Sequence, residues 1–118
     1  MSGGLTTHVL DTARGRPASG LNIQLFRLED TERTLLKSVT TNADGRTDAP
    51  LIARGELRAG VYELVFDVAA YFAASDLPLS QPAFLTRIPV RFGVAGTEAH
   101  YHVPLLVSPW AYSTYRGS

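Results

Sequence analysis

Short segments with the pattern of β-strands, separated by frequent turn signals, are the feature that most limits the fold of this chain. The clearest segment spans residues 21–26, where apolar and polar side chains alternate as they do in a half-buried strand. Further strands are expected over residues 5–11, 35–41, 46–48, 60–66, 87–92, 99–107 and 111–116. Eight strands of this kind predict two facing sheets that bury their apolar sides, which is the arrangement of a β-sandwich.

Turn and helix signals separate these strands. Asp44-Gly45 is a strong signal for a tight turn, and residues 108–110 are expected to join the last two strands as a hairpin. One short helix is expected over residues 68–74, because good helix formers follow Asp67, a suitable helix cap. Pro89 favours an edge position for its strand, since proline lacks the N–H that a central strand donates. Residues 15–17 are expected to break the chain.

Composition sets outer limits on function. A length of 118 residues is typical of a single domain, which is expected to span residues 1–118. An apolar content of 45% indicates a globular chain with a core. The absence of cysteine excludes disulfides, thiolate nucleophiles and thiolate metal sites. Eleven Lys and Arg residues balance eleven Asp and Glu residues, so net charge predicts no binding to nucleic acid or to an anionic membrane.

The sequence shows no membrane or targeting signal. No apolar run approaches the roughly 18–20 residues that span a bilayer. Residues 1–5 contain no basic stretch followed by an apolar segment, so no signal peptide is expected. The default expectation is a cytoplasmic protein, with a periplasmic or peroxisomal location as the open alternatives.

The two faces of residues 99–107 differ in a way that bears on function, because alternate side chains of a strand point to opposite faces. One face is predicted to lie in the core and carries Tyr101, Val103, Leu105 and Val107. The other face carries two imidazoles and two apolar side chains, from His100, His102, Pro104 and Leu106. Apolar residues on both faces of a strand indicate a second burial surface, and hence an interface between copies of the chain.

The histidines are the main candidates for chemistry, because only their ordinary pKa lies near neutrality. The chain has three, His8, His100 and His102, and the last two share one face of the predicted strand. A zinc site needs three or four ligands, so the sequence leaves open both a metal site and surface histidines without a function. Arg46 follows the predicted turn and is either a solvated charge or a fixed cation for an oxyanion. A Gly-x-Ser-x-Gly motif and a phosphate-binding loop are both absent.

Three segments resemble the transthyretin-related 5-hydroxyisourate hydrolases, and the resemblance covers nearly the whole chain. They are residues 5–11 (Leu-Thr-Thr-His-Val-Leu-Asp), residues 41–46 (Thr-Asn-Ala-Asp-Gly-Arg) and the run from His100 to Ser118. The terminal Tyr-Arg-Gly-Ser is specific to the enzymes of this family, and transthyretin lacks it. Transthyretin also lacks His8, Arg46 and His102 at the matching positions, so the hormone carrier is the weaker match.

The resemblance implies a fold, an assembly and a reaction. The fold would be the transthyretin-like (prealbumin-like) β-sandwich of two antiparallel sheets, with seven or eight strands and one short helix. The assembly would be a homotetramer, a dimer of dimers, with a channel lined by the first strand, the last two strands and the short strand near Arg46. The reaction would be the opening of 5-hydroxyisourate by water to 2-oxo-4-hydroxy-4-carboxy-5-ureidoimidazoline, the step after urate oxidation in purine breakdown. No metal or organic cofactor is expected.

The resemblance also implies site residues. His8, Arg46 and His102 are expected to be catalytic, with the imidazoles handling the proton of the attacking water and the guanidinium stabilising the oxyanion. Substrate binding is expected from His8, Arg46, Ser113, Tyr115, Arg116, Gly117 and Ser118. Which histidine activates the water stays open, and His100 is assigned to structure or to the channel rim.

Two other functions are weaker interpretations of the sequence. A carrier for a small apolar ligand would set two histidines and an arginine against that ligand, at a cost of about 1–3 kcal/mol for each unpaired polar group. A purely structural β-sandwich does not explain a C-terminus rich in hydrogen-bonding groups up to its last residue.

Overall fold

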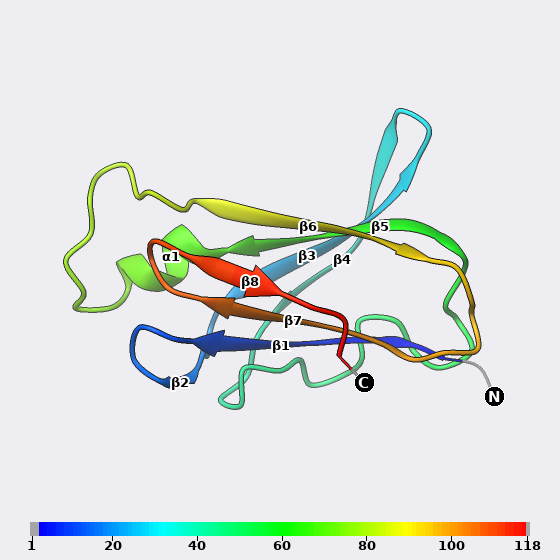
Figure 1. Ribbon diagram of the computed structural model, residues 1–118, viewed down its shortest axis with the longest axis horizontal. Coiled ribbons are helices and arrows are strands. Elements are labelled where there is room, and N and C mark those ends of the chain that lie inside the picture. Colours follow the sequence, from blue (N-terminus) through cyan, green and yellow to red (C-terminus); the bar gives the residue numbers. More distant parts are fainter. Residues whose placement is uncertain (1–2, 118) are drawn as a thin grey trace.

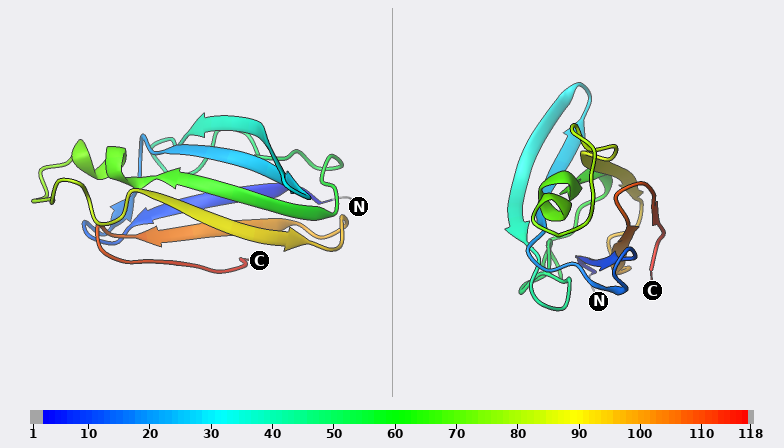
Figure 2. Two further views of the ribbon diagram at one scale, coloured as in Figure 1. Left: turned by 90° about the horizontal axis from the view of Figure 1, so that it is seen from above. Right: turned by 90° about the vertical axis from the view of Figure 1, so that its left-hand side faces the viewer.

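Two four-stranded sheets face each other in the computed structural model, which describes residues 3–117 (Figure 1). The strand order is β2-β1-β7-β8 in the first sheet and β4-β3-β5-β6 in the second. Figure 2 shows the two layers, with a short helix at one end of the sandwich. Over the described residues, the predicted β-sandwich of two facing sheets with one short helix is confirmed.

The second sheet is antiparallel throughout. It consists of β4 (Glu32–Thr40), β3 (Asn22–Glu29), β5 (Gly60–Asp67) and β6 (Arg87–Val94). β6 is an edge strand, as Pro89 predicts. The tip of the β3–β4 hairpin projects beyond the sandwich, so this end of the hairpin is exposed (Figure 1).

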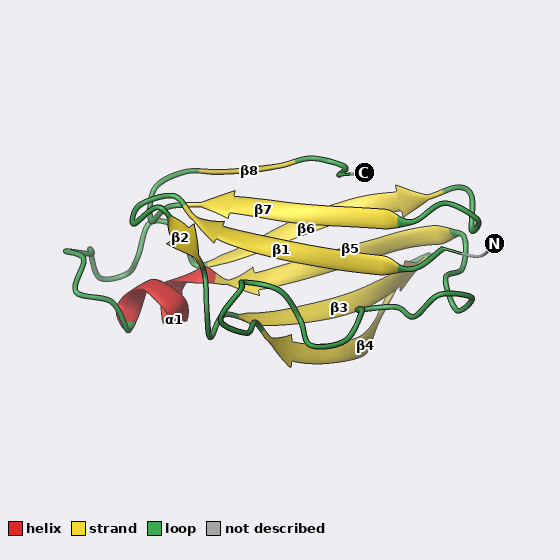
Figure 3. Cartoon of the chain, turned by 90° about the horizontal axis from the view of Figure 1, so that it is seen from below, coloured by secondary structure: helices red, strands yellow, loops and turns green. Residues whose placement is uncertain are grey.

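The helix α1 spans Val68–Ala73 and follows β5 directly, one residue shorter than predicted. Asp67 caps it, because the Asp67 side chain accepts a hydrogen bond from Ala70 N at 3.3 Å. Tyr71 and Phe72 are among the helix residues that are buried, and Figure 3 shows the helix at the end of the sandwich. The helix therefore covers that end of the core.

The first sheet holds both ends of the described chain. It consists of β2 (Arg16–Pro17), β1 (Leu5–Asp11), β7 (Tyr101–Val107) and β8 (Tyr112–Thr114). β1 and β7 run parallel, which corrects the expectation of purely antiparallel sheets for this one pair. A hairpin would force an antiparallel arrangement, whereas the whole second sheet separates β1 from β7 along the chain. β7 and β8 do form the predicted hairpin.

The core lies between the sheets and is built from inward side chains. Leu5 and Val9 on β1 are fully buried, as are Leu105 on β7 and Phe66 on β5. The core face predicted for residues 101–107 is confirmed, because all four of its alternate side chains are buried. The intervening side chains of the same strand therefore point away from the core, to the outward face of the first sheet.

The segment after β4 differs from the prediction. Residues 46–48 form a loop, so the short strand expected there is wrong. Backbone hydrogen bonds hold the loop against β1: Val9 N donates to Gly45 O at 2.8 Å, and Leu5 N donates to Ile52 O at 2.9 Å. Residues 16–17, expected only to break the chain, pair with the end of β1 as β2.

The predicted tight turn at residues 44–45 does form. Gly45 has a φ of 73°, a left-handed conformation that glycine adopts without strain. The Asn42 side-chain oxygen accepts hydrogen bonds from the N–H groups of Asp44 and Arg46, at 2.9 and 3.2 Å. This turn, together with the Gly45 bond to β1, fixes the backbone of Arg46 beside the first sheet.

Candidate active site

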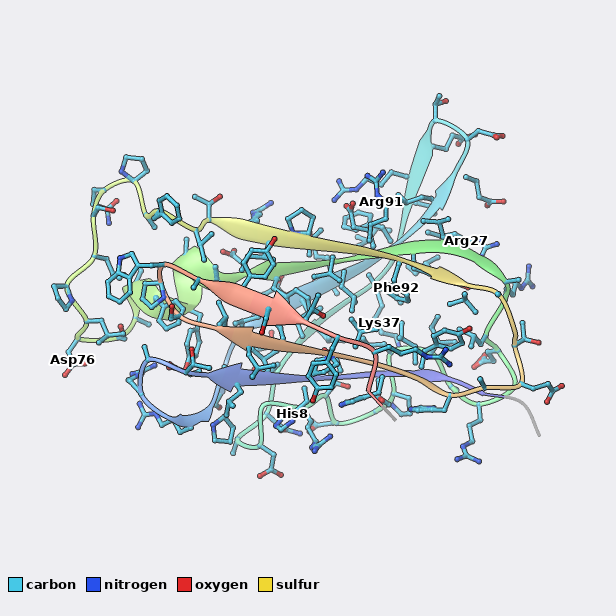
Figure 4. The ribbon with its side chains drawn as sticks, viewed as in Figure 1. His8, Arg27, Lys37, Asp76, Arg91 and Phe92 are labelled. Atoms are coloured by element: carbon cyan, nitrogen blue, oxygen red, sulfur yellow. The ribbon has the colours of Figure 1, made fainter. Side chains whose placement is uncertain are left out.

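The outward face of the first sheet brings residues of β1 and β7 together. The parallel register sets Thr6 opposite His102 and His8 opposite Pro104. Thr6, His8 and His102 are half-buried, and Figure 4 shows His8 on β1. The structure thus places His8 and His102, two of the three residues expected to be catalytic, on the same face of one sheet.

A threonine hydroxyl joins two of the histidines. Thr6 Oγ1 lies 2.9 Å from His100 Nε2 and 2.9 Å from His102 Nδ1. His100 directly precedes β7, and its Nδ1 is buried without a hydrogen-bond partner among residues 3–117. One residue of β1 therefore holds both imidazole rings at the start of β7.

Burial and nearby charge both act on the pKa of His102. The exposed Arg46 side chain lines a recess that it shares with Thr6, at the edge of β1. Burial lowers the pKa of His102, and the charges of Arg46, His8 and His100 lower it further. The His102 imidazole is therefore neutral at neutral pH, which suits it to accept a proton or to donate a hydrogen bond.

The C-terminal tail lies against His102. Gly117 N donates a hydrogen bond to His102 O at 2.7 Å, and the two residues form an isolated β-bridge. A Cβ on Gly117 would lie 2.6 Å from His102 Cδ2, so only glycine fits beside this ring. Figure 3 shows β8 and the tail running along β7. The end of the tail therefore contacts one of the expected catalytic side chains.

The preceding tail residues lie on the other side of β8. Tyr115 and Arg116 line a groove between the edges of β8 and β6, together with Phe92, which Figure 4 labels on β6. The Arg116 guanidinium carbon lies 4.1 Å from the centre of the Tyr101 ring. Since the Tyr101 side chain belongs to the core face, this cation–π contact turns Arg116 away from the histidines and anchors the tail.

The remaining residues expected to bind substrate have different positions. Ser113 pairs with Leu106 across the β7–β8 hairpin, on the same outward face but nearer the hairpin turn. Ser118 and its carboxylate lie outside the described residues.

The sequence by itself does not indicate a role for Thr6. A threonine in a strand is typical of ordinary sheet packing, so residue type alone does not distinguish Thr6 from Thr7. The contact of Thr6 with His100 and His102 depends on the register of β1 against β7. The alternation of β1 indicates that Thr6 and His8 share a face, and that is the only signal that could have pointed to Thr6.

The described residues contain neither a group of metal ligands nor a helix that could span a membrane. In the part of the chain that the structure describes, no three His, Cys, Asp or Glu side chains are grouped as metal ligands. None of the helices in residues 3–117 is long and apolar enough to cross a membrane.

The chain is similar to known proteins over almost its whole length. It is 57% identical over 117 residues to "5-hydroxyisourate hydrolase 2" of Rhizobium meliloti, covering 99% of this chain and 98% of that protein. It is 60% identical over 116 residues to "5-hydroxyisourate hydrolase" of Mesorhizobium japonicum, covering 98% and 93%.

A solved structure and a family model also match this chain. The crystal structure of (S)-allantoin synthase matches with a TM-score of 0.92 and 48% identity, over 99% of this chain and 44% of that chain. This chain thus spans less than half of that synthase. The model of the HIUase/Transthyretin family matches residues 5–117. On the match of fold and sequence over this range, the chain belongs to the HIUase/Transthyretin family.

Proposed function

We propose that this chain hydrolyses 5-hydroxyisourate to 2-oxo-4-hydroxy-4-carboxy-5-ureidoimidazoline. The observation that carries the proposal is the polar cluster at the outward face of the first sheet: His8 and His102 share this face, Arg46 lowers the pKa of His102, and Gly117 packs against the His102 ring. The relatives named 5-hydroxyisourate hydrolase, at 57% and 60% identity over nearly the full chain, support the same reaction.

The reaction calls for a base, an oxyanion stabiliser and a proton for the leaving nitrogen. Water attacks the carbonyl carbon of a ring amide, the C–O bond forms, and the carbonyl oxygen becomes an oxyanion. The C–N bond then breaks, and the released nitrogen takes the proton that the water gave up. The carboxylate and the ureido group of the product are the two halves of that cleaved amide.

The cluster offers groups for each of these steps. A neutral imidazole from His8 or His102 is a suitable base for water near neutral pH. The Arg46 guanidinium supplies a fixed positive charge for the oxyanion. Its charge also lowers the pKa of His102, so the same residue keeps that imidazole neutral. No metal or organic cofactor is needed for this sequence of steps.

The tail is proposed to bind the polar edge of the substrate. Gly117 reaches His102 directly, and Ser113 lies on the same outward face. Arg116 stacks on Tyr101 and holds the tail in place, and Tyr115 lines the adjoining groove. Ser118 is proposed to bind the same polar edge through its carboxylate.

The outward face is also proposed to be an interface in a homotetramer, a dimer of dimers. Leu10 and Leu106 pair on that face and are only half-buried in the single chain. Burial of such a face by a second copy of the chain would enclose the histidines in a channel. Closed, twofold-symmetric assemblies are the commonest outcome for a self-complementary surface.

A carrier for an apolar ligand fits the face less well. His8, His102 and Arg46 would have to be desolvated against the ligand, at about 1–3 kcal/mol for each polar group that loses its partners. The hydrogen-bonded Thr6 and the covering Gly117 serve a polar reactant better than an apolar cargo.

The test is turnover of freshly made 5-hydroxyisourate, generated in place by urate oxidase. We expect the chain to accelerate its disappearance far beyond the spontaneous rate, and His102→Asn to remove most of that acceleration. Folded wild-type protein that leaves the spontaneous rate unchanged would contradict the proposed function.

A further inference from the structure

The Thr6 hydroxyl sits between two imidazole rings, and its hydrogen bonds restrict where their protons lie. Thr6 Oγ1 is 2.9 Å from His100 Nε2 and 2.9 Å from His102 Nδ1. A hydroxyl has a single hydrogen to donate, so it can donate to one of these nitrogens and must accept from the other. Each neutral ring carries one hydrogen, on either of its two nitrogens.

The buried nitrogen of His100 decides between the two arrangements. His100 Nδ1 has no hydrogen-bond partner among residues 3–117. A hydrogen on Nδ1 would be a buried donor without an acceptor, which native structures tolerate less well than an acceptor that lacks a donor. The hydrogen of neutral His100 therefore belongs on Nε2, from where it is donated to the Thr6 oxygen.

The direction of the next hydrogen bond follows from the first. With its oxygen accepting from His100, the Thr6 hydroxyl donates its own hydrogen to His102 Nδ1. His102 Nδ1 then carries a lone pair, so neutral His102 must carry its hydrogen on Nε2. In the imidazole ring Nε2 is bonded to Cδ2, the carbon against which Gly117 packs.

We propose that Thr6 and His100 are positioning residues that fix His102 as the tautomer protonated on Nε2. His102 then acts as a neutral hydrogen-bond donor to the oxyanion, and His8 is the base. The inference rests on the proposed hydrolysis and answers which of the two histidines takes the proton from water.

This assignment keeps the proton balance of the reaction. His8 takes the proton from water as the C–O bond forms, and returns it to the ring nitrogen as the C–N bond breaks. His102 gives a hydrogen bond throughout and neither gains nor loses a proton. A neutral imidazole whose tautomer is fixed is a known way to polarise a carbonyl oxygen.

The direct test is solid-state NMR of the protein labelled with nitrogen isotope in its histidine rings. The chain has three histidines, so His8→Asn and His102→Asn variants are enough to assign the signals. At neutral pH we expect His102 to be protonated on Nε2 with an unprotonated Nδ1, and His100 to show the same tautomer. A His102 ring protonated on Nδ1 would overturn the inference.

Turnover of matched threonine variants gives an independent test. Thr6→Val removes the hydroxyl between the rings, and we expect kcat to fall about tenfold with little change in KM, the scale of one lost orienting hydrogen bond. Thr6→Ser keeps a hydroxyl and should restore most of the activity. In Thr6→Val the NMR signals of His102 should also show a second, Nδ1-protonated population.

Thr7→Val is the matched control. Thr7 is the next residue of β1, and its hydroxyl donates a buried hydrogen bond to Val103 O at 2.7 Å, on the core side of the same two strands. We expect this variant to lower Tm and to leave kcat and the His102 tautomer unchanged. Equal kcat in Thr6→Val and wild type, or equal losses in the two valine variants, would reduce Thr6 to a packing residue.

The two proposals fail in different ways. The NMR measurement needs no substrate, so a wrong tautomer contradicts the positioning role even where turnover is fast. Wild-type protein without turnover contradicts the proposed function even where the tautomer is as expected.

Discussion

At the scale of single residues, the surroundings of His102 account for most of the chemistry proposed for this chain. Arg46 acts on it through charge, Thr6 through a hydrogen bond, and Gly117 through close packing. These three residues come from three separate parts of the chain. The single side chain that they share is therefore the most informative one to perturb.

Substitution of the three proposed catalytic residues should abolish most of the turnover. His8→Asn, Arg46→Glu and His102→Asn should each lower kcat by about 10²-fold or more, the scale of losing a base or an oxyanion stabiliser. His100→Asn is the comparison and should cost much less, because His100 acts only through Thr6. Circular dichroism should show the fold intact in all four variants. Equal losses in His100→Asn and His102→Asn would mean that the two rings do not have the separate roles assigned here.

A side chain at position 117 should displace the His102 ring. Gly117→Ala places a Cβ 2.6 Å from His102 Cδ2, so either the tail or the ring has to move. We expect kcat to fall by about 10- to 100-fold, since a misplacement near 1 Å can cost about 10²-fold. Gly96→Ala is the control, because no atom lies within 4 Å of its added Cβ. Full activity in Gly117→Ala would show that the tail does not rest on His102 in solution.

The lowered pKa of His102 predicts a loss of stability in acid. Burial, and then the charges of Arg46, His8 and His100, lower this pKa below the ordinary value of 6.5 that applies to the unfolded chain. Below that value the unfolded chain binds the proton more readily than the folded chain. The free energy of unfolding therefore falls as the pH drops from 6.5 to the lowered pKa, and then levels off.

Urea unfolding at a series of pH values on both sides of 6.5 checks this prediction. The wild type should lose stability on acidification with a steeper slope than His102→Asn, which lacks the titrating ring. Identical slopes in the two proteins would show that His102 titrates alike in the folded and unfolded states.

At the scale of elements, the parallel pairing of β1 with β7 and the return of the tail along β7 build the site. β1 supplies Thr6 and His8, the start of β7 supplies His102, and the loop after β4 is tied to the edge of β1. The tail after β8 adds the last contact at Gly117. None of these segments contributes its site residues to the core, so the site and the core can be perturbed separately.

Removal of the tail should separate activity from stability. A chain truncated after Thr114 loses residues 115–118, of which the described ones are exposed or half-buried, so Tm should change little. Turnover should fall steeply, because the cover over His102 is lost. Arg116→Ala is the comparison: it keeps the chain end but loses the contact with Tyr101, and an intermediate loss is expected. A truncated chain with near-normal turnover would show that the tail is dispensable.

At the scale of the whole molecule, one chain leaves its proposed site open. The histidines lie on the outward face of a two-layer sandwich, and in the single chain no third layer covers residues 3–117 on that side. Leu10 and Leu106 lie beside the polar cluster. A second copy on this face would bury those leucines and exclude bulk water from the site, which strengthens the electrostatic effect of Arg46.

Light scattering tests this assembly. We expect a mass of about 51 kDa, four times the chain mass of 12.8 kDa. Leu106→Lys should shift the mass to smaller species, because it puts a charge on the outward face. Leu36→Lys is the control, since Leu36 is 47% exposed on β4, in the other sheet. A stable monomer of the wild type at micromolar concentration would contradict the tetramer.

The sequence by itself determined the local structure and the faces of the strands. Alternation placed Tyr101, Val103 and their inward neighbours in the core and His102 on the opposite face, because side-chain direction in a strand depends only on position along that strand. Three other local signals were also correct. Asp67 caps the helix, Pro89 lies on an edge strand, and Asp44-Gly45 forms a tight turn. Residue type singled out the three histidines and Arg46 as candidates, and the resemblance to a known family assigned catalytic roles to His8, Arg46 and His102.

Only the tertiary structure decided how those faces meet. The parallel pairing of β1 with β7, the loop in place of a strand at residues 46–48 and the contact of Arg116 with Tyr101 were not predicted. The hydrogen bonds of Thr6 join residues 94 and 96 positions apart. No local pattern encodes such a pair, because register between distant strands is set by the packing of both sheets on their shared core.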